Sequence, residues 1–319
     1  MATNLSDCAP QRAASGPALQ ELLALGQEHL QQADRGDSAR LEAELLLAHA
    51  LQRPRSYLVT HPGERPAPET AARYQALLAR AAAGEPLAYL TGTREFWSLT
   101  LQVCPDVLIP RPETELAVER CLALLPAPAA PSAATSAAMS DVAFAGAHAA
   151  AGTRRARVCD LGTGSGAIAL ALASERPGWR ITATDISPAA LAVARANARR
   201  LALPQLEFIA GDWFTPLAGR SFELIVSNPP YVGAHDPALD ALGHEPRFAL
   251  TPGDSGLEAL RHLILAARGH LSTGGWLVLE HGADQGPAVA AALVEAGYAR
   301  VGCHRDLAGR DRISEGQRP

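Results

Sequence analysis

The spacing of apolar and polar residues divides the chain into a helical first part and a second part in which strands and helices alternate. In residues 18–95, leucines recur near helical spacing, as Leu19, Leu22 and Leu30 do in ALQELLALGQEHLQQA. We expect at least three short amphipathic helices in this part of the chain. Together they would form a small bundle that serves packing or docking and contains no chemistry of its own.

The ends of the next two predicted helices have recognisable signals. SARLEAELLLAHALQ is expected to begin at Ser38 and to bury Leu41. Pro68 and Gly84 are typical of the first turn and of the C-terminal cap of a further helix. After this helix, SLTLQV alternates like a strand and DVLI is a second short apolar run, so we expect a hairpin linker over residues 96–110.

From Arg157 onward, short apolar runs alternate with helical stretches. The expected strands are RVCDLG, RITATD, LEFIAGD, FELIVSN and GWLVLEHG, and the helices between them are GAIALALASERP, PAALAVARANARRLAL and LEALRHLILAARGHL. Alternation of this kind predicts an α/β fold with a doubly wound, mostly parallel sheet.

These patterns predict four parts in the chain. We expect a disordered N-terminus at 1–17, a helical docking domain at 18–95, the hairpin linker and a larger domain at 111–319. Within the larger domain, residues from about 126 to 154 are rich in Ala, Pro, Ser and Gly, which predicts a flexible surface insertion.

Composition narrows the choice of partners. The formal net charge of −5 argues against a general electrostatic grip on nucleic acid. All 28 basic residues are arginine, so a catalytic lysine is excluded. Five scattered cysteines, the lack of an apolar leader and the lack of a run of roughly 20 apolar residues favour a soluble, cytoplasmic protein without a membrane span.

A glycine-rich loop follows the first parallel strand, in CDLGTGSGAIALAL. Gly162, Gly164 and Gly166 permit a tight turn and the close approach of a ligand. Asp185 ends the next strand, where an acid can accept hydrogen bonds from both hydroxyls of a ribose. The loop therefore predicts a nucleoside site, although its glycines also satisfy the dinucleotide pattern G-x-G-x-x-A.

Two acidic positions bear on the choice of nucleoside. Asp160 immediately precedes the loop, where it would repel a pyrophosphate but suit the cationic end of S-adenosylmethionine. After the third strand, Asp212 and Trp213 are placed to meet the amino group and the face of an adenine. Both can equally be ordinary loop residues.

The string SNPPYV follows the fourth parallel strand, at the sheet edge where ligands bind in such folds. The side chain of Asn228 and the carbonyl of Pro229 offer two rigid acceptors, and Tyr231 offers an aromatic face. This arrangement fits a planar NH₂ group, whose methylation would depend mainly on positioning and electrostatics.

With these motifs in order, the chain resembles class I S-adenosylmethionine-dependent methyltransferases, and more closely the release factor glutamine methyltransferases (the PrmC/HemK family). The resemblance extends over roughly residues 18–317, and its further motifs are PLAYLTGTREFWSL, LIPRPETE, EPRFAL and LEHG. It implies a Rossmann-like methyltransferase domain and methylation of the glutamine amide in the Gly-Gly-Gln motif of class 1 peptide chain release factors. The insertion is longer than the family's pattern.

The resemblance also implies roles for individual residues and partners. We expect a monomer that binds the release factor as its protein substrate and forms no stable complex with nucleic acid, a membrane or a metal. Glu113 of RPETE can equally cap the following helix, so it is not assigned. The resemblance places cofactor binding at Gly162, Thr163, Gly164, Ser165, Gly166, Asp185, Trp213 and Asn228, substrate binding at Asn228, Pro229, Pro230 and Tyr231, and catalysis at Asn228, Pro229 and Tyr231.

Two other functions remain open on the motifs alone. An adenine or cytosine amino group is also a planar NH₂, so a nucleic-acid methyltransferase satisfies the same pattern, although such an enzyme must hold a polyanion. A non-catalytic nucleotide-binding protein would share the glycine loop but would not need the NPPY segment.

Overall fold

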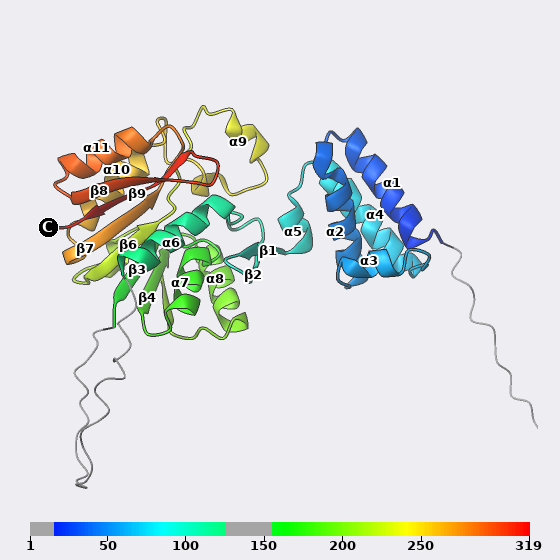
Figure 1. Ribbon diagram of the computed structural model, residues 1–319, viewed down its shortest axis with the longest axis horizontal. Coiled ribbons are helices and arrows are strands. Elements are labelled where there is room, and N and C mark those ends of the chain that lie inside the picture. The colour runs from blue at the N-terminus through cyan, green and yellow to red at the C-terminus, as the bar shows by residue number, and fades with distance from the viewer. Residues whose placement is uncertain (1–15, 126–154) are drawn as a thin grey trace, which may run out of the picture. The chain divides into compact units, whose positions relative to one another are not determined.

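The computed structural model describes residues 16–125 and 155–319, which divide between Gly92 and Thr93 into two compact units (Figure 1). The predicted flexible insertion lies outside the described residues, as does all of the predicted disordered N-terminus except residues 16 and 17. Within the described ranges, none of the helices is long and apolar enough to cross a membrane.

The first unit is a small helical bundle. Its core gathers the apolar faces of three longer helices, and Leu19, Leu46 and Leu47 are fully buried there. The prediction that Leu41 is buried was wrong, because this side chain is 45% exposed. The α helices are α1 (Leu19–Gln32), α2 (Ala39–Leu51), α3 (Ser56–Thr60), α4 (Pro68–Ala82) and α5 (Leu87–Thr91).

The second unit begins with a hairpin whose strands differ from those predicted. β1 (Thr93–Phe96) pairs with β2 (Leu99–Gln102), and the turn residues Trp97 and Ser98 both have positive φ, as a two-residue hairpin turn requires. The DVLI run is therefore not the partner strand. Its flanking residues Pro105 and Pro110 cannot donate ladder hydrogen bonds, which explains why this run extends past the hairpin as a loop.

The rest of the second unit confirms the prediction of a doubly wound, mostly parallel sheet. Its strand order is β5-β4-β3-β6-β7-β9-β8, in which the first five are parallel and β9 runs antiparallel to both neighbours. The last two strands were not predicted. The strands are β3 (Arg157–Leu161), β4 (Arg180–Asp185), β5 (Leu206–Ala210), β6 (Phe222–Ser227), β7 (Leu271–Glu280), β8 (Ala299–Arg305) and β9 (Asp311–Gln317).

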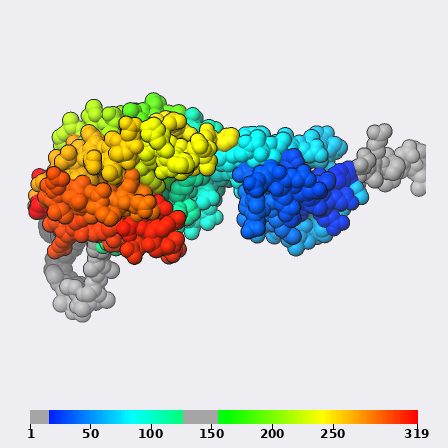
Figure 2. Space-filling model, turned by 90° about the horizontal axis from the view of Figure 1, so that it is seen from above, coloured from blue at the N-terminus to red at the C-terminus, as the bar shows by residue number. Residues whose placement is uncertain are grey.

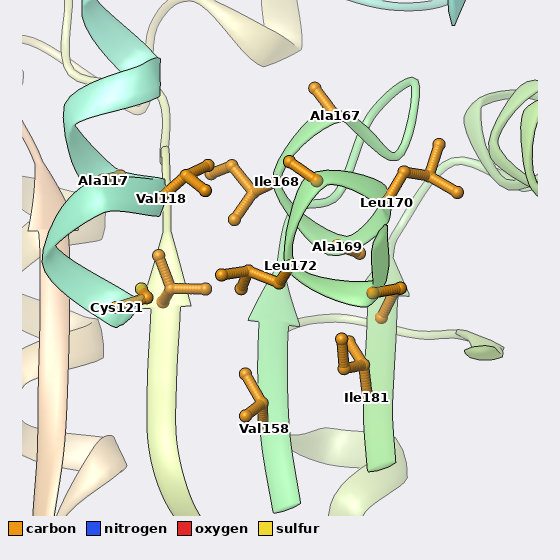
Figure 3. Close-up of a cluster of buried hydrophobic side chains, with 14 of the residues drawn as sticks. Ala117, Val118, Cys121, Val158, Ala167, Ile168, Ala169, Leu170, Leu172 and Ile181 are labelled. Carbon is orange, nitrogen blue, oxygen red and sulfur yellow. The ribbon is translucent and has the colours of Figure 1, made fainter. Parts of the chain in front are cut away.

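Helices cover both faces of this sheet (Figure 1). On one face, Val158 packs in a cluster with side chains of α6 and α7 such as Val118 and Ile168 (Figure 3). The next residue, Cys159, lies in the cluster on the other face with side chains of α10 and α11. The helices are α6 (Glu115–Leu124), α7 (Ala167–Glu175), α8 (Pro188–Arg200), α9 (Ala238–Ala241), α10 (Glu258–Ala267) and α11 (Gly286–Glu295).

The carboxyl ends of three central strands meet at one edge of the sheet. Leu161, the last residue of β3, is paired with Thr184 on one side and with Ser227 on the other. The Ser227 hydroxyl also donates a buried hydrogen bond of 2.7 Å to the carbonyl of Leu161. Since β4 and β6 flank β3 but are not consecutive along the chain, this edge is the switch point at which such folds bind ligands.

Asn197 of α8 ties the hairpin to the loop that follows β3. Its fully buried side-chain amide exchanges hydrogen bonds with the backbone of Gln102 and donates another, of 2.9 Å, to the carbonyl of Ser165. All polar atoms of this amide are thereby paired inside the protein.

Two carboxyl groups, Asp160 of β3 and Glu280 of β7, are each only 1% exposed. Burial raises the pKa of each carboxyl to about 7, although hydrogen bonds from Thr163 and Ala169 to Asp160, and from Thr114 and Tyr231 to Glu280, act in the opposite direction. The folded chain therefore retains protons that the unfolded chain releases between about pH 4 and pH 7.

This proton balance predicts how Glu280→Gln changes stability with pH. Below the unfolded pKa both proteins carry a neutral side chain, whereas above pH 7 only the wild type must bury a charge. The free energy of unfolding of the variant should therefore rise relative to wild type between about pH 4.5 and pH 7, by up to roughly 1 kcal/mol per pH unit, and level off above that range. Denaturant unfolding followed by tryptophan fluorescence measures this, because Trp97, Trp179, Trp213 and Trp276 all lie in the second unit.

Glu207→Gln is the matched control, because hydrogen bonding to Arg220 lowers the pKa of that carboxyl. Its stability relative to wild type should change in the opposite direction, falling as the pH rises from the lowered folded pKa to the unfolded pKa and staying constant above it. A difference between Glu280→Gln and wild type that does not vary with pH would contradict the assignment of a raised pKa to Glu280.

Candidate active site

A cavity of about 240 Å³ opens at the carboxyl edge of the central strands. Several segments far apart in the sequence build its wall, each following a strand or preceding a helix. The residues around it are Asp106, Val107, Leu108, Gly162, Gly164, Asp185, Ile186, Ala190, Gly211, Asp212, Trp213, Asn228, Pro230, Phe248 and Ala249.

The glycine loop forms the floor of this cavity. Gly162 and Gly164 have φ of +70° and +56°, which side chains rarely adopt. A Cβ on Gly162 would lie 3.4 Å from the Trp213 ring, whereas a Cβ on Gly164 would meet nothing within 4 Å. The loop therefore brings bare backbone against the cavity beside an aromatic ring.

Three other predicted loop residues shape this turn from inside the protein. The Thr163 hydroxyl donates a 2.6 Å hydrogen bond to Asp160, and the Ser165 carbonyl accepts the one from Asn197. Gly166 is followed by α7, and a Cβ there would lie 2.9 Å from Leu170. Among the residues that the structure describes, these three support the loop and do not line the cavity.

Asp185 is held rigidly at the end of β4. Its two carboxylate oxygens accept backbone hydrogen bonds from Gly164 (2.8 Å) and Ser187 (2.9 Å), so the carboxylate bridges the glycine loop and the start of α8. Burial raises the pKa of this carboxyl, although these hydrogen bonds oppose the effect. An acceptor fixed in this way can receive ribose hydroxyls without losing much conformational entropy.

The charges around the cavity fit S-adenosylmethionine. The lining contains Asp106, Asp185 and Asp212 but no basic side chain from the described residues. Beneath the loop, the buried Oδ1 of Asp160 has no hydrogen-bond partner in the described part of the chain. A sulfonium and an ammonium group suit this acidic surrounding, whereas a pyrophosphate would be repelled.

Asn228 lines the cavity and directly follows Ser227, the last residue of β6. Its side-chain Nδ2 donates a 3.2 Å hydrogen bond to the hydroxyl of Thr114, which is buried at the start of α6. With the amide in this orientation, Oδ1 is the end that remains available as an acceptor. Thr114 belongs to the RPETE stretch, in which sequence reasoning had considered only Glu113.

The last residue of β7 and the segment that follows it fix Tyr231 through its hydroxyl and its backbone carbonyl. Its hydroxyl donates a 3.1 Å hydrogen bond to Oε1 of Glu280, and its backbone carbonyl accepts one of 2.9 Å from Gln285. Pro229 is buried beside it, and Pro230 lines the cavity. Pro229 and Tyr231 are not among the described residues that line this cavity.

The outer wall consists of two loops that the sequence did not assign to the cofactor site. Val107 and Leu108 come from the loop after the hairpin, and the exposed ring of Phe248 comes from the EPRFAL stretch. Glu245 joins these loops, because its buried carboxylate accepts hydrogen bonds from the backbone of Ile109 and from Arg111. The chain between the NPPY segment and Phe248 runs over the surface of the second unit, yellow in Figure 2.

Of the predicted site residues, the structure brings Gly162, Gly164, Asp185, Trp213, Asn228 and Pro230 together around one cavity. In the described ranges, His, Cys, Asp and Glu side chains form no cluster suited to a metal ion.

Comparison with known proteins identifies the family. Residues 21–92 match the model of the PrmC N-terminal domain, and residues 147–293 match that of the methyltransferase small domain. The release factor glutamine methyltransferase of Vibrio cholerae is 45% identical over 293 residues, covering 91% of this chain and 93% of that protein.

Two further relatives match this chain over a similar length. The release factor glutamine methyltransferase of Escherichia coli is 41% identical and covers 91% of this chain and 96% of its own length. That of Pseudomonas aeruginosa is 47% identical and covers 88% of this chain and 93% of its own. The predicted family, enzyme class and methyl donor are therefore confirmed, and the chain belongs to the S-adenosylmethionine-dependent release factor glutamine methyltransferases.

Proposed function

We propose that this chain methylates the side-chain amide nitrogen of the glutamine in the Gly-Gly-Gln motif of class 1 peptide chain release factors. The observation that supports it most directly is the orientation of Asn228. Its NH₂ group is bonded to Thr114, so its carbonyl oxygen is free to accept an N–H from a second amide at the cavity.

S-adenosylmethionine, when bound, supplies an electrophilic methyl group on its sulfonium. The residues proposed to hold it are the glycine loop from Gly162 to Gly166, Asp185 at the ribose, Trp213 at the adenine and Asn228 at the border with the substrate. Because buried and partly buried hydrogen bonds fix the loop and Asp185, cofactor binding should cost little conformational entropy there.

An amide nitrogen is a weak nucleophile, because its lone pair is delocalised into the carbonyl. We assign Asn228 and the carbonyl of Pro229 to accept its two N–H bonds, with Pro230 and Tyr231 as the walls. These acceptors orient the nitrogen and return electron density to it as the C–N bond forms. The N–H proton becomes acidic only then, so a strong base is not required before the attack.

A substrate recognised only through a small amide needs a further surface for specificity. We assign docking of the release factor to the first unit, which has a buried core of its own and contributes none of the described residues that line the cavity. The net charge of −5 favours a protein partner over nucleic acid. A monomeric, cytoplasmic enzyme accords with this role in translation.

Transfer of label from S-adenosylmethionine tests the proposed reaction. Wild type should label an unmodified release factor but neither a Gln→Ala variant of its Gly-Gly-Gln motif nor DNA. Asn228→Ala should lower kcat by about a hundredfold, because a donor–acceptor contact to the reacting amide is lost.

The amide variant Gln205→Ala is the matched control, because this side chain bonds the Ala173 carbonyl and does not line the cavity. It should retain wild-type kcat. Label on DNA in place of the release factor would contradict the proposal and would favour the nucleic-acid methyltransferase.

Removal of residues 1–92 tests the docking role. The shortened enzyme should methylate a short Gly-Gly-Gln peptide at the wild-type rate, because both hydrophobic clusters of the second unit remain. Its KM for the whole release factor should rise by at least about tenfold, the loss expected when a docking surface is removed. An unchanged KM for the whole factor would refute docking by the first unit.

A further inference from the structure

The NPPY segment is supported by a buried polar network that lies behind the cavity. Glu280, the last residue of β7, is 1% exposed and follows the apolar run of a central strand. Such a carboxyl is costly to bury and needs compensating contacts. Its position in LEHG gave no indication of its partners, because they come from two distant parts of the chain.

One of these partners is Tyr231, whose hydroxyl donates to Oε1 of Glu280 at 3.1 Å. The other is Thr114, whose hydroxyl accepts the 3.2 Å bond from Asn228 and lies close enough to the Glu280 carboxyl to lower its pKa. Oε2 of Glu280 is buried and has no hydrogen-bond partner among the described residues. Asn228 and Tyr231 are therefore both connected to the Glu280 carboxylate. Tyr231 bonds it directly, whereas Asn228 is connected through Thr114.

This arrangement decides which end of the Asn228 amide meets a substrate. A hydroxyl that donates to Glu280 has its lone pairs left to accept from Nδ2 of Asn228. If the amide were reversed, its oxygen would face the lone pairs of Thr114 and its NH₂ would face the NH₂ of the substrate. Both contacts would be repulsive, so the network selects the orientation that accepts a hydrogen bond.

We propose that Glu280 is a positioning residue for methyl transfer, which aligns the Asn228 carbonyl through Thr114 and the Tyr231 ring through its hydroxyl. The inference rests on the proposed function and adds to it a carboxylate that touches neither substrate nor cofactor. Charged groups on the surrounding elements also face Glu280: Arg312 of β9 holds its pKa down, whereas Glu113, next to Thr114, raises it.

Three near-isosteric variants test this role: Glu280→Gln, Thr114→Val and Tyr231→Phe. Glu280→Gln should lower kcat on the release factor by about tenfold to a hundredfold, the cost of a small misplacement of a reacting group. Its KM for the release factor and its Kd for S-adenosylmethionine should stay within about twofold of wild type, since Glu280 lines neither surface. Glu280→Leu should be slower than Glu280→Gln, because glutamine keeps an acceptor for the Tyr231 hydroxyl.

The combined variants distinguish positioning from a general structural role. If Glu280 acts through its two partners, adding Glu280→Gln to the Thr114→Val, Tyr231→Phe double variant should change kcat by less than about twofold. Additive losses would overturn the proposal, as would a wild-type kcat for Glu280→Gln or a loss confined to cofactor affinity. Glu207→Gln, the same substitution on β5, should leave kcat unchanged.

If Glu280→Gln fails to fold, the cycle between Thr114→Val and Tyr231→Phe decides the question. The two losses should be coupled, because Glu280 is the group that joins them, and strict additivity would overturn the inference. The proposed function is tested separately by the wild type. An enzyme that leaves the release factor unlabelled refutes that function, whereas an active wild type with an equally active Glu280→Gln refutes only the positioning role.

Discussion

The pairing of β3 with β4 on one side and β6 on the other is the constraint on which the rest of the site depends. Leu161 is paired with both Thr184 and Ser227, and the Ser227 hydroxyl bonds the Leu161 carbonyl. Each of these three paired residues is followed directly by a residue of the site: Gly162, Asp185 and Asn228. A shift of one residue in either ladder would turn side chains to the opposite face and separate the proposed cofactor residues from the proposed substrate residues.

The electrostatics of the edge follow from the same geometry. Strands that are buried on both faces bring Asp160 and Glu280 into the interior near the ends where loops diverge, and burial raises the pKa of both carboxyls to about 7. Asp185 lines the cavity itself, and no arginine or histidine of the described residues joins it there. An acidic, partly desolvated surrounding favours a cationic cofactor and disfavours phosphate, so the charge pattern and the glycine loop together select the nucleoside.

The sequence predicted what depends on local pattern. The parallel strands through β7, the glycine turn, Asp185 and the NPPY corner are each specified by a short run of residues, and six of the predicted site residues line one cavity. Leu41 was misjudged because the run LLL in α2 leaves more than one apolar face open. The sequence did not predict the roles of Thr114, Glu280 and Asn197. Each depends on a partner many residues away that only the folded sheet brings near. The hairpin was paired wrongly for a related reason, because a two-residue turn of Trp97 and Ser98 lacks the usual glycine or asparagine signal.

In the proposed mechanism, the side-chain carbonyl of Asn228 and the backbone carbonyl of Pro229 hold the NH₂ group of the substrate glutamine. Thr114 meanwhile holds the NH₂ group of Asn228. A crystal structure of the enzyme with S-adenosylhomocysteine and a Gly-Gly-Gln peptide measures this directly. We expect the glutamine nitrogen to lie about 2.7–3.2 Å from both carbonyl oxygens, with Nδ2 of Asn228 still bonded to Thr114. A glutamine nitrogen bonded elsewhere, or an Asn228 amide reversed toward the peptide, would contradict it.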